Sequence, residues 1–360
     1  MQAEVSSSVL ALSIAEAIQL IKAAPKDAII GLMGPPGFGK SSAPAQAAKE
    51  MGWHYLCRYL ALMEVVEING VPYLVDKDGH KVGMWAAFDG LFPLATDSFD
   101  GEMLLNLDDL GQATPGVTKG GIRTAYGDGI ERMVGMQKLH PNVRVCFTAN
   151  SHLHRSGAHR LEAYVQNRCC IIQVEPNPIE WVSWYLEHSG NPRIAGWIRF
   201  TKTVSDFAPE KDSFMSPRSL VKLGEMLDSL SKNRVNGRIG RAVSYGIIGE
   251  QAGSAFMAYD ALSDGLPDMD AVLRGDKVKL PDRAEVQYMF AAAFLQATKE
   301  KHVPIAAQLI TDLTQTGGTG FEVAAFLTFE ALKGGAAHLR AIRTQPALYK
   351  WLSEFGKYLP

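Results

Sequence analysis

The 360-residue chain has little cysteine, no excess of one charge and no long apolar run, and each shortage excludes a class of protein. Its four cysteines lack C-x-x-C spacing, which argues against zinc and redox motifs, and their apolar neighbours indicate buried, reduced thiols. A formal net charge of −2 gives no global attraction to nucleic acid or to an anionic membrane. Because the sequence contains neither an apolar stretch of about 18 residues nor a charged-then-apolar leader, we expect a cytoplasmic protein without a membrane partner.

The chain is long enough for two or three domains with sizeable cores. Its first half alternates short apolar strands with helical patterns, which predicts a parallel sheet with helices on both faces. The expected strands cover residues 28–33, 54–59, 103–109, 143–148 and 169–174. Later apolar residues recur at helical spacing, over 179–187, 194–200, 219–231, 243–262, 284–299 and 305–314. We therefore predict an α/β nucleotide-binding domain over residues 1–175, a helical lid over 176–265 and a helical C-terminal extension over 266–360.

Residues 34–41 read Gly-Pro-Pro-Gly-Phe-Gly-Lys-Ser and fit the spacing G-x-x-x-x-G-K-[ST]. In such a loop, N–H groups wrap nucleotide phosphates, the lysine reaches the outer phosphates and the serine holds Mg²⁺. The motif follows an apolar strand and opens an Ala-rich helical stretch, so we favour a phosphate loop over a plain Gly/Pro turn. The residues that we expect to bind ATP are Gly34, Pro35, Pro36, Gly37, Phe38, Gly39, Lys40, Ser41 and Ser42.

Two carboxylates, Asp108 and Asp109, end the apolar strand of residues 103–109. Mg²⁺ takes oxygen ligands, and the water that attacks a phosphate needs a base or an orienting group nearby. We therefore assign Ser41 and Asp108 to the metal, the latter through water, and Asp109 to the attacking water. The alternative is that both acids cap the next turn, where Asp is common.

Together these features resemble an AAA+ ATPase, specifically one of the MoxR-type group, over most of residues 10–260. Thr148-Ala149-Asn150 stands where the family has its sensor-1 polar residue, and Asn167-Arg168 precedes the last strand where the family has an arginine finger. Ser216-Pro217-Arg218-Ser219 matches the sensor-2 arginine of the helical lid. The resemblance implies that Asn150 and Arg168 are catalytic and that Arg218 contacts the nucleotide.

The family's two inserts are also matched. The predicted β-hairpin of residues 67–84 resembles the insert in the second helix of the MoxR-type group, and residues 139–141 fit the second hairpin. We expect the first hairpin and residues 126–140 to face the pore or one end of a ring and to contact clients.

The resemblance implies a Mg²⁺- and ATP-dependent ATPase that forms a homo-oligomeric ring, a hexamer, and remodels or activates a protein client. The family commonly works with a partner that bears a von Willebrand factor A domain. Asp109 stands where the family usually has Glu and is one methylene shorter, so slow turnover is expected, and a nucleotide-binding scaffold is a further possibility. The alternative function is a DNA-associated ATPase, as a motor or regulator subunit of a phage or defence system.

Other candidates are weaker. Arg155 and Arg160 are alternatives for a second finger, although surface placement is favoured for each. The residues His152, His154, His159 and Cys146 match no zinc spacing. The basic residues Lys232, Arg234, Arg238 and Arg241 are compatible with nucleic acid, but a solvated connection after the lid helix is the favoured interpretation.

Overall fold

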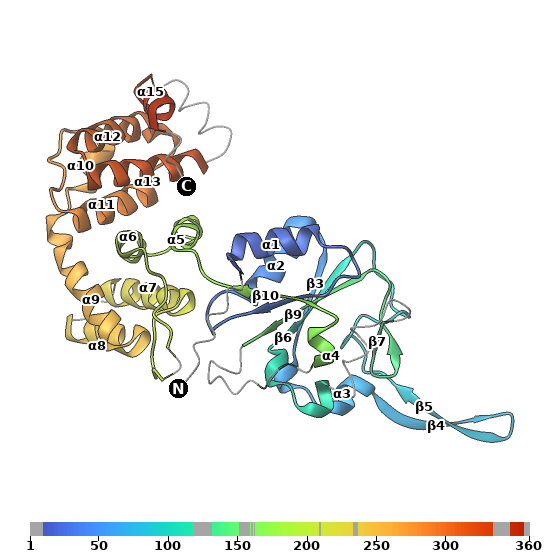
Figure 1. Ribbon diagram of the computed structural model, residues 1–360. Coiled ribbons are helices and arrows are strands. Elements are labelled where there is room, and N and C mark those ends of the chain that lie inside the picture. The colour runs from blue at the N-terminus through green and yellow to red at the C-terminus, as the bar shows by residue number, and fades with distance from the viewer. Residues whose placement is uncertain are drawn as a thin grey trace. The chain divides into compact units, whose positions relative to one another are not determined.

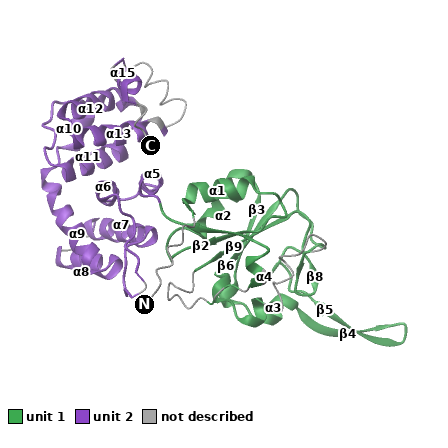
Figure 2. Ribbon diagram, viewed as in Figure 1, with its two compact units in different colours: residues 1–176 green, residues 177–360 purple. Residues whose placement is uncertain are grey.

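The computed structural model describes residues 10–118, 132–150, 159, 161, 163–208, 210–232, 237–333 and 346–355. The chain divides into two compact units, Met1–Pro176 and Asn177–Pro360, which Figure 2 colours green and purple. The first unit contains the residues of the predicted α/β domain, and the bounds of that domain stay a prediction. The predicted lid and extension lie together in the second unit, so a functional division at residue 265 stays a prediction.

The described residues of the first unit form ten strands, of which six make one sheet (Figure 1). The strands are β1 (Ala11–Leu12), β2 (Ile30–Met33), β3 (His54–Tyr59), β4 (Val71–Lys77), β5 (His80–Ala86), β6 (Met103–Asp108), β7 (Met133–Val134), β8 (Gln137–Lys138), β9 (Val143–Ala149) and β10 (Cys170–Val174). The α-helices are α1 (Ile14–Ala23), α2 (Ser42–Met51), α3 (Val65–Asn69) and α4 (Ala163–Gln166), and short 3-10 helices cover Leu60–Leu62 and Leu110–Gln112.

The sheet has the order β1-β10-β2-β9-β6-β3, and every neighbouring pair is parallel. Because the strands run the same way, the carboxyl ends of β2, β9 and β6 meet at one edge. β1, which the sequence analysis did not predict, extends the sheet beyond β10.

Each face of this sheet buries its own hydrophobic core. On one face Leu104 packs in a cluster with residues of α1 and α2, and on the other Leu105 packs in a cluster that includes Leu60 and Val165. Adjacent residues of a strand point to opposite faces, so an uninterrupted apolar run is what a strand covered on both sides requires. The ribbon has α1 and α2 on one side of the sheet and α3 and α4 on the other (Figure 1). The predicted fold class, a parallel sheet between helices followed by an all-helical part, is confirmed.

The predicted hairpin begins later than expected. Residues 65–69 form α3, which ends at Gly70 (φ 85°), and the antiparallel hairpin consists of β4 and β5. The sequence Lys77-Asp78-Gly79 predicts a turn at the tip of this hairpin, and the structure confirms it, since Asp78 and Gly79 both have positive φ, as a two-residue type I′ turn requires. β7 and β8 form a second, very short antiparallel pair near residues 139–141. Residues 119–131 lie outside the described residues.

The second unit is helical throughout. Its helices are α5 (Pro178–Glu187), α6 (Pro192–Thr201), α7 (Pro217–Lys232), α8 (Gly237–Ile248), α9 (Glu250–Asp260), α10 (Met269–Arg274), α11 (Ala284–Ala297), α12 (Val303–Thr316), α13 (Thr319–Lys333) and α15 (Pro346–Phe355). Short 3-10 helices cover Ala261–Gly265 and Glu300–His302.

Two expectations for this unit were wrong. The helix predicted over residues 243–262 is broken at Gly249, whose φ of 84° separates α8 from α9. Asp282, whose residue type and place before the helical pattern predict an N-cap, does not cap α11; Arg283 is the N-cap residue, without a side-chain cap, and Asp282 pairs with Lys279 at 3.0 Å.

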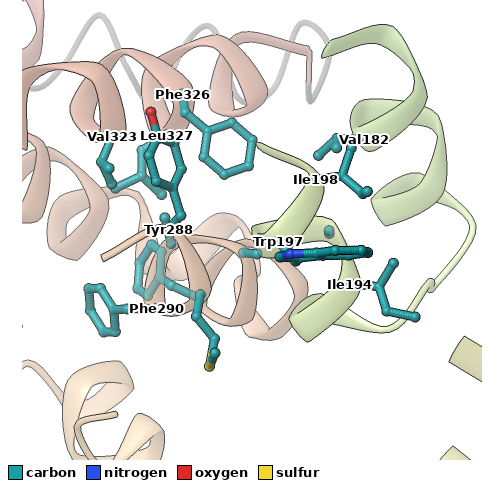
Figure 3. Packing of buried hydrophobic residues seen from close by; sticks show 14 of the residues in the cluster. Val182, Ile194, Trp197, Ile198, Tyr288, Phe290, Val323, Phe326 and Leu327 are labelled. Atoms are coloured by element: carbon teal, nitrogen blue, oxygen red, sulfur yellow. The ribbon is translucent and has the colours of Figure 1, made fainter. Parts of the chain in front are cut away.

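A single hydrophobic cluster joins the helices of the second unit (Figure 3). Trp197 and Ile198 of α6 belong to it together with Tyr288 of α11 and Phe326 of α13. The predicted lid and extension therefore share a core, which explains why they form one compact unit.

Two remaining expectations concern cysteines and membranes. Cys146 is buried as predicted, whereas Cys57 and Cys169 are half-buried and Cys170 is exposed, contrary to the expectation of four buried thiols; all four are free. Cys170 begins β10 and pairs with Ile30 on one side, whereas β1, on the other side, pairs only with Gln173 and Val174. Among the described residues, no helix is both long and apolar enough to cross a membrane.

Candidate functional site

The phosphate loop connects β2 to α2 at the carboxyl edge of the sheet. Gly37 (φ 81°) and Gly39 (φ 88°) adopt the left-handed backbone that favours glycine. A Cβ atom on Gly34 would lie 2.8 Å from the carbonyl oxygen of Val174, so this position also requires glycine. The local sequence thus shapes a tight loop directly before the amino end of a helix, where backbone N–H groups favour anions.

Lys40 ties this loop to the neighbouring strand. Its Nζ donates to the carbonyl oxygen of Pro35 at 2.7 Å and to Oδ1 of Asn150 at 3.0 Å. The side chain is only 6% exposed. Because Asn150 directly follows β9, the lysine bridges the loop after β2 and the end of the next strand in the sheet.

The two acids at the end of β6 lie in different environments. Asp108 is 4% exposed, and its Oδ1 accepts hydrogen bonds from Ser41 Oγ at 2.8 Å and from Thr148 Oγ1. Asp109 is half-buried and left-handed (φ 53°, ψ 41°), a conformation that Asp tolerates better than most residues. The Nδ2 atom of Asn150 lies 3.4 Å from Asp109 Oδ1. Two consecutive acids are therefore directed to two separate partners.

Thr148 is the residue whose role the sequence analysis missed. It is fully buried, its hydroxyl donates to the Asp108 carboxylate, and the same oxygen accepts the backbone N–H of Asp109 at 3.3 Å. One side chain thus holds the carboxylate of the first acid and the backbone of the second. A hydroxyl two residues before Asn150, in an otherwise apolar strand, was the available signal.

The residues at this edge fit a magnesium ion. Mg²⁺ prefers oxygen ligands and is held in nucleotide sites by one or two protein groups together with phosphates and water. The hydroxyl of Ser41 and the carboxylate of Asp108 already lie within hydrogen-bond distance, so both oxygens face one point. The described part of the chain contains no cluster of three or more His, Cys, Asp or Glu side chains that could hold a metal alone.

A polar cluster lies within the sheet on the strand that ends in the acids and on its two neighbours. Asn106, a polar residue within the otherwise apolar strand β6, is fully buried and donates through Nδ2 to Tyr55 Oη at 3.3 Å and to Cys57 Sγ at 3.7 Å. Its Oδ1 accepts from Cys146 Sγ at 3.5 Å. Burial, followed by the negative charge of Asp108, raises the pKa of the Cys57 thiol, which keeps it uncharged beside the acids.

Arg168 does not join this site in its own chain. It precedes β10, and Cys170 pairs with Ile30 at the start of β2, whereas the phosphate loop follows Met33 at the end of β2. The strand between them spans roughly 10 Å, so the arginine lies toward the opposite, amino edge of the sheet.

Other predicted residues lie elsewhere. Arg218 is exposed in the first turn of α7, in the second unit, where Ser216 and Ser219 exchange backbone-to-hydroxyl hydrogen bonds. His159 is exposed, and its backbone N–H donates to the carbonyl oxygen of Gly111 at 2.7 Å. The following candidates lie outside the described residues: His152, His154, Arg155, Arg160 and Arg234.

Comparison with known proteins gives distant likenesses in structure alone. No family model matches the chain, and no curated protein matches it. A point mutant of RuvB from Thermotoga maritima is 14% identical over 74% of this chain and 79% of that chain, with a TM-score of 0.39. NtrX from Brucella abortus, in complex with ATP, is 14% identical over 95% of this chain and 67% of that chain, with a TM-score of 0.37. Structural similarity at these TM-scores does not indicate a function.

The class of protein is defined by the chain's own sheet and loop. A parallel sheet in which β2 leads through a phosphate loop into α2, with two acids at the end of β6 and Asn150 after the intervening strand β9, is a P-loop nucleotide-binding fold.

Proposed function

We propose that the chain is an ATPase of the MoxR type that binds Mg²⁺ and ATP at the phosphate loop and works as a homo-oligomeric ring, a hexamer, on a protein client. The proposal rests on one observation, the connected set of polar side chains at the carboxyl edge of the sheet. That set consists of Lys40, Ser41, Asp108, Asp109, Thr148 and Asn150.

ATP binding would redirect bonds that the loop now makes to itself. Lys40 Nζ, which donates to the Pro35 carbonyl, would donate to the outer phosphates, where a positive charge gains most. Ser41 would ligate Mg²⁺ through Oγ while its hydroxyl continues to donate a hydrogen bond to Asp108. Bound Mg²⁺ neutralises charge on the phosphate oxygens during transfer. Arg218 would add a cation from the lid.

Hydrolysis would depend on Asp109 and Asn150. The Asp109 carboxylate orients a water molecule and accepts its proton while the water oxygen bonds to the γ-phosphorus and the bond to the β-γ bridging oxygen breaks. Asn150 lies 3.4 Å from that carboxylate and also accepts from Lys40, so it links the water to the phosphate lysine. The shorter Asp in place of Glu predicts slow turnover.

Arg168 would act on the nucleotide of a neighbouring subunit. Its position toward the amino edge of the sheet keeps it from its own phosphate loop. A permanently charged guanidinium that forks onto phosphate is suited to a finger supplied by the next subunit. Turnover would then require the ring.

The β4–β5 hairpin would contact the client. Exposed apolar side chains cover both of its faces, among them Leu74 at 69% and Tyr73 at 44% exposure. The hairpin extends well away from the sheet of its own unit (Figure 1). Exposed apolar patches of this kind mark interaction surfaces. We propose a client on this hairpin and, from the family resemblance, a partner with a von Willebrand factor A domain as adaptor.

Phosphate release measured over a range of protein concentrations, together with the mass of the assembly by light scattering, tests the proposal. We expect Mg²⁺-dependent turnover per subunit to rise as rings form with ATP. An absence of Mg²⁺-dependent turnover at every concentration would contradict the assigned activity. If the monomer already reached the full turnover per subunit, the proposed ring would be contradicted, but the proposed ATPase activity would still be supported.

A further inference from the structure

The exposed face of α8 carries positive charge that no described residue balances. From residue 229 to 249 the sequence has no acidic residue but has the basic residues Lys232, Arg234, Arg238 and Arg241. Arg238 and Arg241 are both exposed, and in the described ranges neither forms an ion pair.

Many other basic side chains of the second unit do have acidic partners. Arg274 pairs with Asp276 at 2.9 Å, and Lys279 pairs with Asp282 at 3.0 Å, although all four are well exposed. Solvent exposure alone therefore does not explain why the α8 arginines are unpaired. Over this segment the chain contributes only positive charge, which suits an anionic partner.

The same face is also open to close approach. α8 buries Ser244 and Ile248, whereas Arg238, Ala242 and Gly246, spaced four residues apart, form an exposed row on one side of the helix. A Cβ atom added to Gly246 would meet nothing within 4 Å. Packing against the described residues therefore does not require glycine at this position. Helix stability does not favour it either, because glycine weakens a helix relative to alanine.

We propose that this face, formed by Arg238, Arg241, Ala242 and Gly246, binds the phosphate backbone of a nucleic acid. Guanidinium groups fork onto phosphate oxygens, and the small residues let the strand come close to the helix. This face shares no residue with the ATP site or with the hairpin, and the proposal does not depend on ATP hydrolysis.

Two other anionic partners fit the face less well. Among the described residues of α8, Ile239, at 46%, is the one large apolar side chain that is well exposed to solvent. The exposed face of the helix therefore lacks the apolar surface that membrane binding needs. A protein partner would call for an apolar interface core, which this row of small and charged residues does not supply. Because the contacts are to phosphate, binding should be insensitive to sequence and steeply dependent on salt.

Fluorescence anisotropy of a labelled mixed-sequence DNA oligonucleotide, single-stranded and duplex, titrated with the full chain at several salt concentrations, tests the proposal. The double substitution Arg238→Gln/Arg241→Gln should weaken binding about tenfold and reduce the slope of log K against log salt by about 2. The matched control is Arg274→Gln/Lys279→Gln, which removes the same charge from ion-paired positions and should change affinity less than about twofold.

The substitution Gly246→Leu tests whether the nucleic acid must come close to α8, because it adds a large side chain without changing the charge. It should leave thermal stability unchanged or higher and weaken DNA binding about fivefold or more, whereas Gln251→Leu at an exposed position of α9 should not weaken it. The proposal is overturned if the wild-type chain binds no DNA at low salt, or if both charge variants lose affinity equally. Binding of polyglutamate but not of DNA would also overturn it, in favour of an acidic protein partner.

Discussion

The carboxyl edge of the sheet and the β4–β5 hairpin depart from the usual distribution of side chains in opposite directions. At the sheet edge, Lys40, Asp108 and Asn150 are charged or polar and yet buried. On the hairpin, Leu74, Met84 and Trp85 are large and apolar and yet exposed. Burying a charge or exposing an apolar patch carries a cost in free energy, so neither arrangement is expected from stability alone.

The comparison separates two kinds of function. The polar edge is internally satisfied, since each acid has a hydroxyl, amide or N–H partner, and is thus pre-organised for a small charged ligand. The large apolar side chains of the hairpin are instead exposed, which suits contact with a large partner. We therefore assign ATP hydrolysis to the sheet edge and client contact to the hairpin. The following experiments test this assignment.

The largest effect on turnover is expected from Arg168, because this arginine lies away from the phosphate loop of its own chain and would complete the site of a neighbouring subunit. Arg168→Ala should bind ATP nearly normally and lower turnover about 1,000-fold, because a finger arginine stabilises transition-state charge. Mixing it with Lys40→Ala subunits should restore part of the activity, since a Lys40→Ala subunit donates an intact finger to a neighbour with an intact loop. Proof of subunit exchange with labelled chains, combined with no recovery, would refute action across the boundary.

The second-largest effect on turnover is expected from Asp109, whose proposed role differs from that of Asp108. Asp109→Asn should lower turnover about 100-fold or more while ATP affinity stays within about twofold, because the amide cannot accept the proton. Asn also tolerates the left-handed backbone at this position, so the fold should be kept. Asp108→Ala serves as the contrast and should weaken Mg²⁺-dependent binding. Parental turnover in Asp109→Asn would assign the water to another residue.

A smaller effect is expected from Thr148→Val, which keeps the shape but removes the hydroxyl. Loss of two hydrogen bonds, one to each acid, should lower kcat about tenfold and raise the Mg²⁺ concentration needed for half-maximal activity. Thr148→Ser should restore both values. A merely structural role would lower thermal stability but leave the Mg²⁺ dependence unchanged.

The smallest effect on hydrolysis is expected from the hairpin. Replacing residues 73–84 with Asn-Gly joins Pro72 to Trp85, which face each other in the ladder, through a favoured two-residue turn. Basal turnover should stay within about twofold, whereas cross-linking to a client should be lost. Loss of ring assembly in this variant would show that the hairpin serves subunit contacts instead.

Much of the fold could be predicted because its signals are local. The spacing of Ser13 and Glu16 predicts a capping box, and the structure contains it. The strand predicted over residues 103–109 forms over Met103–Asp108, and the turn at Asp78-Gly79 is present. Each of these follows from residues near one another in the sequence. The break at Gly249 was missed because apolar helical spacing continues across it, and only a positive φ marks the end of α8.

The site was predictable to a lesser degree. The phosphate loop and the acids have motifs, but the position of Thr148 between both acids depends on β9 lying beside β6, which no local pattern contains. Asn106 remained unexplained for the same reason, since its partners come from β3 and β9. Register between strands distant in sequence decides such contacts.

The most direct test of the central claim is isothermal titration of ATP with Mg²⁺ into the wild-type chain and into Lys40→Ala, with folding checked by circular dichroism. Lys40 lies at the junction of the loop and Asn150, so its removal takes the positive charge from the phosphates without disturbing either core. The account predicts binding by the wild-type chain and affinity at least about 100-fold weaker for the variant. Equal affinity in a folded Lys40→Ala protein would contradict the assignment of residues 34–42 as the nucleotide site.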